Sequence, residues 1–128
     1  MTRWFLPLAL IAAPASTAPL TVRVGDTVAF RLAHGDPVAA HPIAATAKPA
    51  RGEIKVAVRA LFGTMMTVTS NSASGYTFKA ELIGADGKPL PARTCTLPPG
   101  NQPTLESWPQ KAAAVRLGQF KPAQGGRC

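Results

Sequence analysis

Apolar and polar side chains alternate with a period of two over most of the chain, and this pattern constrains the fold more than any other feature. Residues 54–62 show it most clearly, with one face formed by Ile54, Val56, Val58, Ala60 and Phe62 and the other by Lys55, Ala57, Arg59 and Leu61. Because successive side chains of a strand point to opposite sides, this segment is predicted to be a strand with one buried face.

Similar alternation predicts further strands between turn-forming residues. Tyr76, Phe78, Ala80 and Leu82 form the apolar face of one. The others span residues 20–24, 27–32, 65–70, 90–97 and 111–120, and the last could also form a helical turn. Gly25 and Asp26 are predicted to turn the chain between the first two strands. About six to eight short strands favour a single all-β domain, a small antiparallel β-sandwich of immunoglobulin-like size, with a small β-barrel as the alternative.

Residues 33–52 show no such pattern and are rich in Ala and Pro. Both histidines of the chain, His34 and His41, lie in the first half of this segment. Long segments without secondary structure are uncommon in a compact domain unless they are mobile or functional. This segment is therefore predicted to be a mobile loop in which a function could lie.

The N-terminal residues have the features of a secretory signal peptide. Arg3 precedes an apolar run from Trp4 to Ala13, and small residues follow it. The run is about 10 residues long, roughly half of what a membrane-spanning helix requires. Residues 1–15 are predicted to be removed before Ser16, with cleavage possible up to Ala18, so that residues 16–128 form one exported domain, periplasmic or secreted, without a transmembrane anchor.

The two cysteines, Cys95 and Cys128, both lie in the predicted exported domain. Oxidising compartments favour disulfides, and two cysteines allow a single pairing. Such a bridge would stabilise the domain by roughly 3 to 4 kcal/mol in the chain-entropy model. The sequence contains no Cys-x-x-Cys motif typical of disulfide oxidoreductases.

The chain is basic, with a net charge of +8, and loss of Arg3 with the leader would lower this value by only one. Arg23, Arg31, Lys55 and Arg59 fall on the solvent-facing rows of their predicted strands and are candidates for an anion-binding surface. The alternative is that they keep the sheet faces soluble. Nucleic acid is a less favoured partner because the chain is predicted to be exported and has only 6% aromatic residues.

The segment from Leu20 to Leu32, which contains Val-Gly-Asp-Thr-Val and is followed by His34 and His41, resembles the N-terminal strands of cupredoxins. In that family a blue-copper site uses two His, one Cys and usually a Met. No His follows Cys95 in this chain, so the resemblance extends only to the strands. His34 and His41 remain candidate ligands of a different copper or zinc site, although no cofactor is expected in the favoured interpretation.

No nucleophile elbow, zinc-protease motif or phosphate-binding loop occurs in the chain, and an enzyme is not expected. Trp108, between two prolines, is predicted either to cover one end of the core or to anchor a partner. The favoured hypothesis is an exported, non-catalytic binding protein whose partner is a protein or an anionic component of the cell envelope. The alternatives are a periplasmic metal-handling protein using His34 and His41, and an inhibitor of an acidic exported enzyme.

Overall fold

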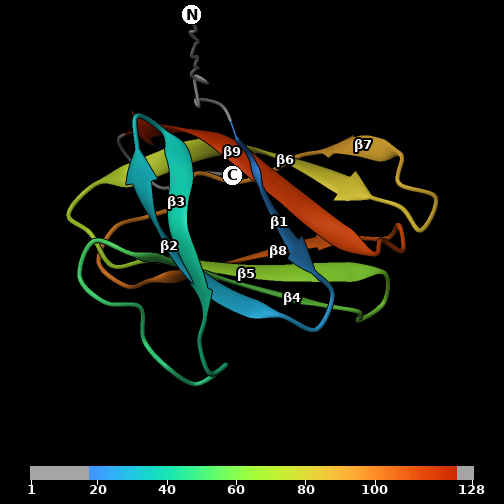
Figure 1. Cartoon of the computed structure of the whole chain (residues 1–128), viewed down its shortest axis with the longest axis horizontal. Helices are drawn as coiled ribbons and strands as arrows, with labels where there is room; N and C mark the ends of the chain where they lie inside the picture. Colours follow the sequence, from blue (N-terminus) through green and yellow to red (C-terminus); the bar gives the residue numbers. More distant parts are fainter. Residues whose placement is uncertain (1–17, 124–128) are drawn as a thin grey trace, which may run out of the picture.

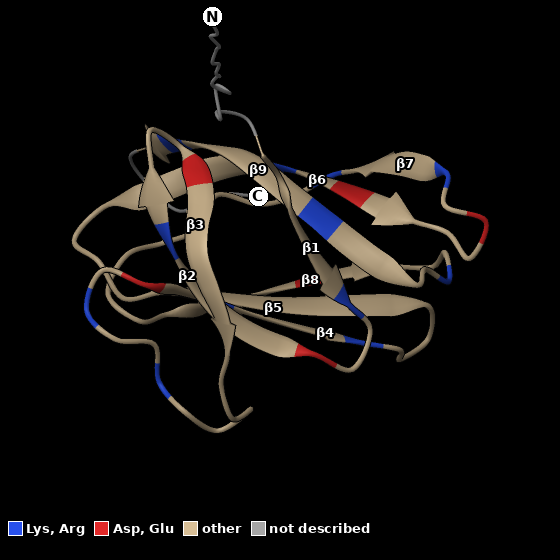
Figure 2. Cartoon of the chain, viewed as in Figure 1, with Lys and Arg blue, Asp and Glu red and all other residues tan. Residues whose placement is uncertain are grey.

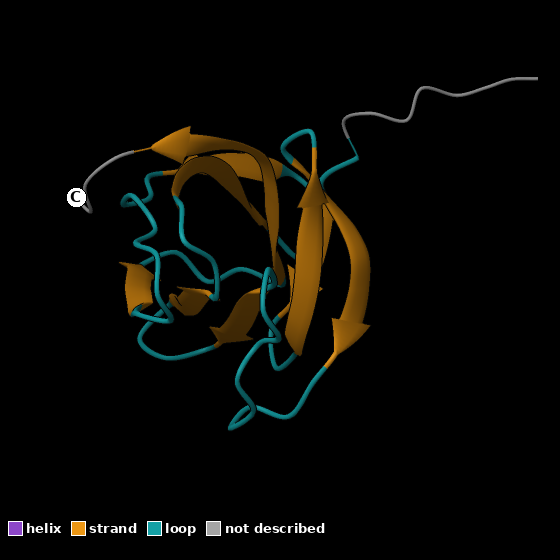
Figure 3. Cartoon of the chain, turned by 90° about the vertical axis from the view of Figure 1, so that its left-hand side faces the viewer, coloured by secondary structure: helices purple, strands orange, loops and turns teal. Residues whose placement is uncertain are grey.

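The computed structural model describes residues 18–123, which form two antiparallel β-sheets packed face to face (Figure 1). The four-stranded sheet has the order β1 (Leu20–Arg23), β9 (Ala114–Ala123), β6 (Gly75–Ile83) and β7 (Pro89–Ala92). The five-stranded sheet has the order β3 (Asp36–Pro42), β2 (Thr27–Ala33), β4 (Ile54–Arg59), β5 (Thr64–Ser70) and β8 (Pro103–Trp108). Strands and loops account for the whole described chain, as predicted for an all-β domain (Figure 3). The two separate sheets confirm the predicted sandwich over the barrel.

The alternating apolar residues of the sequence form the core between the sheets. On β4 the side chains of Ile54, Val56 and Val58 are buried, as predicted. Phe120 of β9 lies at the centre of an aromatic cluster, with its ring stacked on Phe78 at 5.0 Å and edge-on to Phe30 at 5.7 Å. Burial of these faces is the main force that holds the two sheets together.

The predicted buried face of residues 54–62 is wrong at its C-terminal end. β4 ends at Arg59, and both Ala60 and Phe62 are exposed in the loop that leads to β5. The alternation continues in the sequence, but the backbone turns before the last two positions reach the core.

Residues 33–52 are not a structureless segment, because they contain β3. His34 and Gly35 have φ angles of 54° and 85°, and two left-handed residues in a row are what a tight hairpin turn requires. β3 returns along β2, with a bulge opposite Phe30 where Ala39 has a φ of 55°. Residues 43–52 then cross the outer face of the five-stranded sheet, where Lys55 Nζ donates hydrogen bonds to the carbonyls of Ala45 and Ala47.

The C-terminal third differs from the prediction in two places. The strand predicted at 90–97 is the shorter β7, and residues 93–97 instead cross from β7 toward β8. β8 itself was not predicted, whereas the strand predicted at 111–120 is found as β9. The predicted signal peptide and Cys128 lie outside the described residues. Within residues 18–123 no helix has the length and hydropathy to cross a membrane.

Four turns lie together at one end of the sandwich, which we name the hairpin end. The strand registers bring residues 24–26, 60–63, 84–88 and 109–113 to this end, on the right-hand side of Figure 1. Backbone hydrogen bonds hold the first of these turns in place, from Gly25 N to Val58 O of β4 at 2.8 Å and from Val24 N to Ala113 O of the last turn at 3.0 Å. The turn at residues 24–26 is therefore attached to both sheets.

Candidate functional site

The structure does not bring the two candidate metal ligands together. His34 lies in the turn before β3 and His41 lies near the far end of that strand, so at strand spacing they are roughly 20 Å apart. Among residues 18–123 no group of three or more His, Cys, Asp or Glu side chains has the arrangement of a metal site.

His41 instead contacts a buried carboxylate. Its Nε2 lies 2.8 Å from Oε2 of Glu53, and the N–H of Ala50 donates to Oε1 at 3.0 Å. The hydrogen bond from His41, followed by that from Ala50, lowers the pKa of Glu53 below its ordinary value. Because His41 is on the edge strand and Glu53 precedes β4, this pair fastens β3 to the sheet.

The four candidate anion-binding residues do not form one cluster, and three of them bind the protein's own backbone. Arg31 Nη1 donates to Arg51 O at 3.1 Å, and Lys55 donates to the loop carbonyls described above. Arg59 donates to Asp26 O at 3.2 Å and to Oγ1 of Thr27 at 2.9 Å. These three cations therefore hold loops against the sheet.

Arg23, the fourth candidate, is different. It is exposed on β1, at the edge of the hairpin end, and its side chain makes no hydrogen bond or ion pair with the described residues. Its charge is therefore available to a partner.

Trp108 is buried, with 9% of its surface exposed, and its indole N–H donates to Arg93 O at 3.1 Å. It belongs to the core beneath the segment that crosses from β7. Glu106, two residues earlier on β8, is also buried and accepts the N–H of Cys95 at 2.7 Å. Burial raises the pKa of Glu106, against the opposing effect of that hydrogen bond.

Cys95 lies beside this buried carboxylate, while Cys128 is outside the described residues. The disulfide therefore stays a prediction. The mass of the unreduced protein from its native source tests it: a mass lower than that of the reduced protein by two hydrogen atoms is expected, and two titratable thiols would contradict the pairing.

The most unusual exposed side chain of the described residues is that of Phe62, at the tip of the loop between β4 and β5. It is 91% exposed and its backbone has a φ of 50°. A left-handed backbone is a genuine outlier for a bulky residue and costs roughly 1 to 2 kcal/mol. An aromatic ring held in water on a strained backbone is unfavourable on both counts, so folding alone gives no reason for Phe at this position.

The neighbouring backbone fixes this conformation. Gly63 has a φ of 111°, and a Cβ at this position would lie 2.2 Å from Trp108 O and 2.7 Å from Pro109 O. Only glycine fits such a close approach. The loop therefore packs tightly against the turn that follows β8, while the side chains of Phe62 and of the 45% exposed Leu61 stay accessible to solvent.

Basic side chains lie at the same end of the sandwich as this apolar tip. The hairpin end carries Lys88, Lys111, Arg23 and Arg59 on four different elements, against two acidic residues, Asp26 and Asp86 (Figure 2). Lys88, Lys111 and Arg23 are exposed, and none of their side chains has a partner among the described residues. The site thus combines a protruding aromatic ring with unpaired positive charge.

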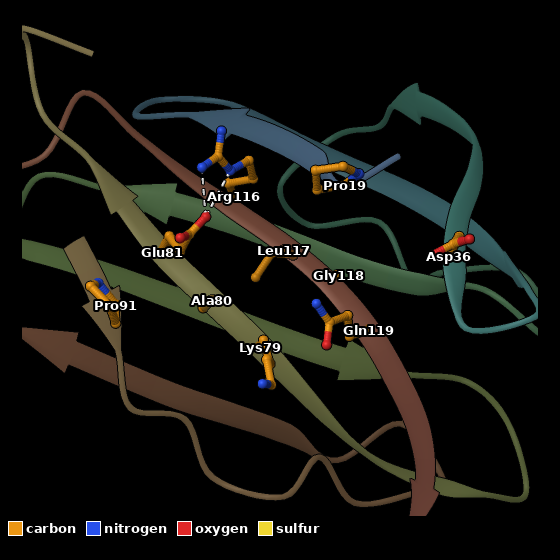
Figure 4. A pocket seen from close by; sticks show the side chains of 10 residues that line it. All are labelled: Pro19, Asp36, Lys79, Ala80, Glu81, Pro91, Arg116, Leu117, Gly118 and Gln119. Atoms are coloured by element: carbon orange, nitrogen blue, oxygen red, sulfur yellow. Dashed lines mark hydrogen bonds and ion pairs between the residues drawn. The ribbon is translucent and has the colours of Figure 1, made fainter. Parts of the chain in front are cut away.

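A second feature is a groove of about 540 Å³ on the outer face of the four-stranded sheet (Figure 4). Gly118, which lacks a side chain, lies beside Pro19 at its floor. On one wall Arg116 Nη2 donates to Oε1 of Glu81 at 2.6 Å, and Lys79 lies nearby on β6. Opposite charges are already paired in this groove, so it offers a ligand less unbalanced charge than the hairpin end does.

Comparisons with known protein families, with curated proteins and with solved structures find no match for this chain. The candidate site therefore rests on the geometry alone. Sequence reasoning missed Phe62 because the alternation of β4 assigned it to the core. The available signal was Gly63, since a glycine that interrupts a strand pattern marks a turn or a close approach of the backbone.

Proposed function

We propose that this chain is an exported, non-catalytic binding protein that meets its partner through the hairpin end. The observation that carries the proposal is the 91% exposed ring of Phe62 on a left-handed backbone. Strained residues persist where the surrounding structure holds them and are concentrated at functional sites. Single aromatic anchors of this kind supply much of the binding energy of interfaces.

The partner is a protein or an anionic component of the cell envelope. The unpaired cations Arg23, Lys88 and Lys111 support an anionic surface, because opposite charge accelerates encounter and favours binding. Export, which this proposal includes, rests on the N-terminal sequence of residues 1–15.

The experiment measures sedimentation of the purified protein with envelope membranes from its own source. Burying a Phe side chain stabilises a complex by roughly 1.5 to 3 kcal/mol, so Phe62→Ser is expected to weaken binding by about 10- to 100-fold. The matched control is Leu105→Ser, which removes a 60% exposed side chain from the outer face of β8. Equal binding of the wild-type protein and Phe62→Ser would refute the hairpin end as the contact surface.

One observation favours a second candidate, an inhibitor of an acidic exported enzyme. The tip formed by Leu61 and Phe62 exposes both side chains, and its backbone is held by the close packing of Gly63. A rigid loop with exposed apolar side chains is suited to enter an active-site cleft at low entropic cost. This candidate predicts saturable inhibition of such an enzyme that Phe62→Ser abolishes and Leu105→Ser retains.

A further inference from the structure

We propose that the partner of the hairpin end is an anionic lipid bilayer, with Phe62 and Leu61 inserted among the lipids and the surrounding cations at the headgroups. This inference rests on the proposed function and names the partner of the same site. A lipid partner is favoured over a protein because one short apolar tip is combined with basic side chains distributed over several elements.

The apolar part of the hairpin end is the tip between β4 and β5, formed by Leu61 and Phe62. The 45% exposed Leu90 lies outside it, on β7, where it pairs with the buried Leu82. Two exposed apolar side chains are few for a stable protein interface, which buries about 800 Å² on each partner. A fluid lipid layer needs no matching pocket, so a short apolar tip can enter it.

The basic part is also distributed. Arg23, Lys88 and Lys111 come from three different elements, and all three are without a side-chain partner among the described residues. A headgroup layer offers negative charges without fixed positions, so flexible, unpaired cations at several points match it well. Arg59 contributes charge but is held by its bonds to Asp26 and Thr27.

Neither part is sufficient by itself. Asp26 and Asp86 offset some of the positive charge, although Asp86 Oδ1 is engaged by the N–H of Lys88 at 2.9 Å. Stable attachment to a membrane commonly needs two signals, an inserted apolar group and a basic patch. The hairpin end carries both on one surface, and this co-occurrence is the reason for the proposal.

The first experiment measures sedimentation of the purified protein with vesicles of phosphatidylcholine alone and of an equimolar mixture with phosphatidylglycerol. Binding to the anionic vesicles is expected, with little binding to the neutral ones. Phe62→Ser should weaken it by about 10- to 100-fold, whereas Leu105→Ser should leave it unchanged. The double variant Arg23→Gln with Lys111→Gln should weaken binding and reduce its dependence on salt, and the matched control is Lys79→Gln with Lys121→Gln, at positions away from the hairpin end.

The second experiment reports insertion directly. Phe62→Trp keeps an aromatic ring at the tip, and its fluorescence should shift to the blue and be quenched by brominated acyl chains when anionic vesicles are added. Leu105→Trp, on the outer face of the five-stranded sheet, should show neither change.

The outcomes separate this inference from the proposed function. If Phe62→Ser loses binding to envelope membranes while the wild-type protein ignores anionic vesicles, the hairpin end binds a protein and the lipid inference is overturned. Loss of envelope binding after protease treatment of the membranes would have the same meaning. If vesicle binding occurs but is equal for Phe62→Ser and Leu105→Ser, the charge alone acts and insertion is overturned.

Discussion

Replacing Phe62 with glycine is expected to make the protein more stable. The ring is 91% exposed, so its loss removes almost no buried surface. The left-handed backbone, with a φ of 50°, costs an L-residue roughly 1 to 2 kcal/mol, and glycine avoids this cost. Glycine also gives the unfolded chain more freedom, which opposes the gain by roughly 0.5 to 1 kcal/mol. The net effect is a gain of about 0 to 1.5 kcal/mol in the free energy of unfolding, and the middle of this range corresponds to about 3 to 5 °C in Tm.

The matched control is Phe62→Ala, which removes the same ring but keeps a Cβ on the left-handed backbone. Its free energy of unfolding should stay within about 0.5 kcal/mol of the wild-type value, as for most surface substitutions. Chemical denaturation of the three proteins under identical conditions provides the measurement. A loss of stability in Phe62→Gly, or an equal change in both variants, would refute the argument that Phe62 is retained at the expense of stability.

Three further predictions concern residues around the site and the core. Gly25→Ala should lower the free energy of unfolding by about 1 to 2 kcal/mol for its positive φ alone, because nothing lies within 4 Å of the added Cβ. Gly63→Ala should lower it by about 1 to 3 kcal/mol more, because its Cβ meets backbone carbonyls. Equal losses of stability in thermal denaturation would contradict the close packing of the loop at residues 60–63. The lowered pKa of Glu53 means that the hydrogen bond from His41 to its carboxylate stabilises the protein above the ordinary carboxyl value of 4.5 and is lost as the pH falls below that value. The stability difference between wild type and His41→Ala should therefore shrink on acidification, and a constant difference would argue against the pair. The raised pKa of Glu106 means that its charged form disfavours folding as the pH rises above 4.5. In denaturant titrations the free energy of unfolding of Glu106→Gln should therefore increase relative to that of the wild-type protein between about pH 4 and pH 8. A decrease relative to the wild-type value over that range would refute the raised pKa.

Alternation predicts the central strands because their two faces have different surroundings. β4 and β6 each have one face in the core and one toward solvent, so the period-two pattern in the sequence is complete. The turn between β1 and β2 is also encoded locally, by Gly25, whose φ is 99°. For these elements the local pattern and the tertiary environment agree, and a correct prediction follows.

The two missed strands are edge strands, where this agreement fails. β3 is largely exposed on both faces and contains Pro37 and Pro42, which are tolerated because an edge strand has a free side. β8 has an inverted pattern, with Leu105 60% exposed and Glu106 buried. A pattern read from hydropathy assigns these side chains to the wrong faces, because the donor that makes the burial of Glu106 tolerable, the N–H of Cys95, lies 11 residues earlier in the sequence.

Phe62 differs from the two other residues whose burial does not match their hydropathy, Glu106 and Leu105. Glu106 is buried against expectation, but it has a hydrogen-bond partner within the protein, so its role is accounted for by the fold. Leu105 is exposed on a regular extended strand, and single exposed leucines on a surface are ordinary. Phe62 alone among the three combines an exposed apolar side chain with a left-handed backbone, and its strain is maintained by the contact of Gly63 with the next turn. Since no contact inside the described chain compensates that cost, the compensation is expected from a partner outside it.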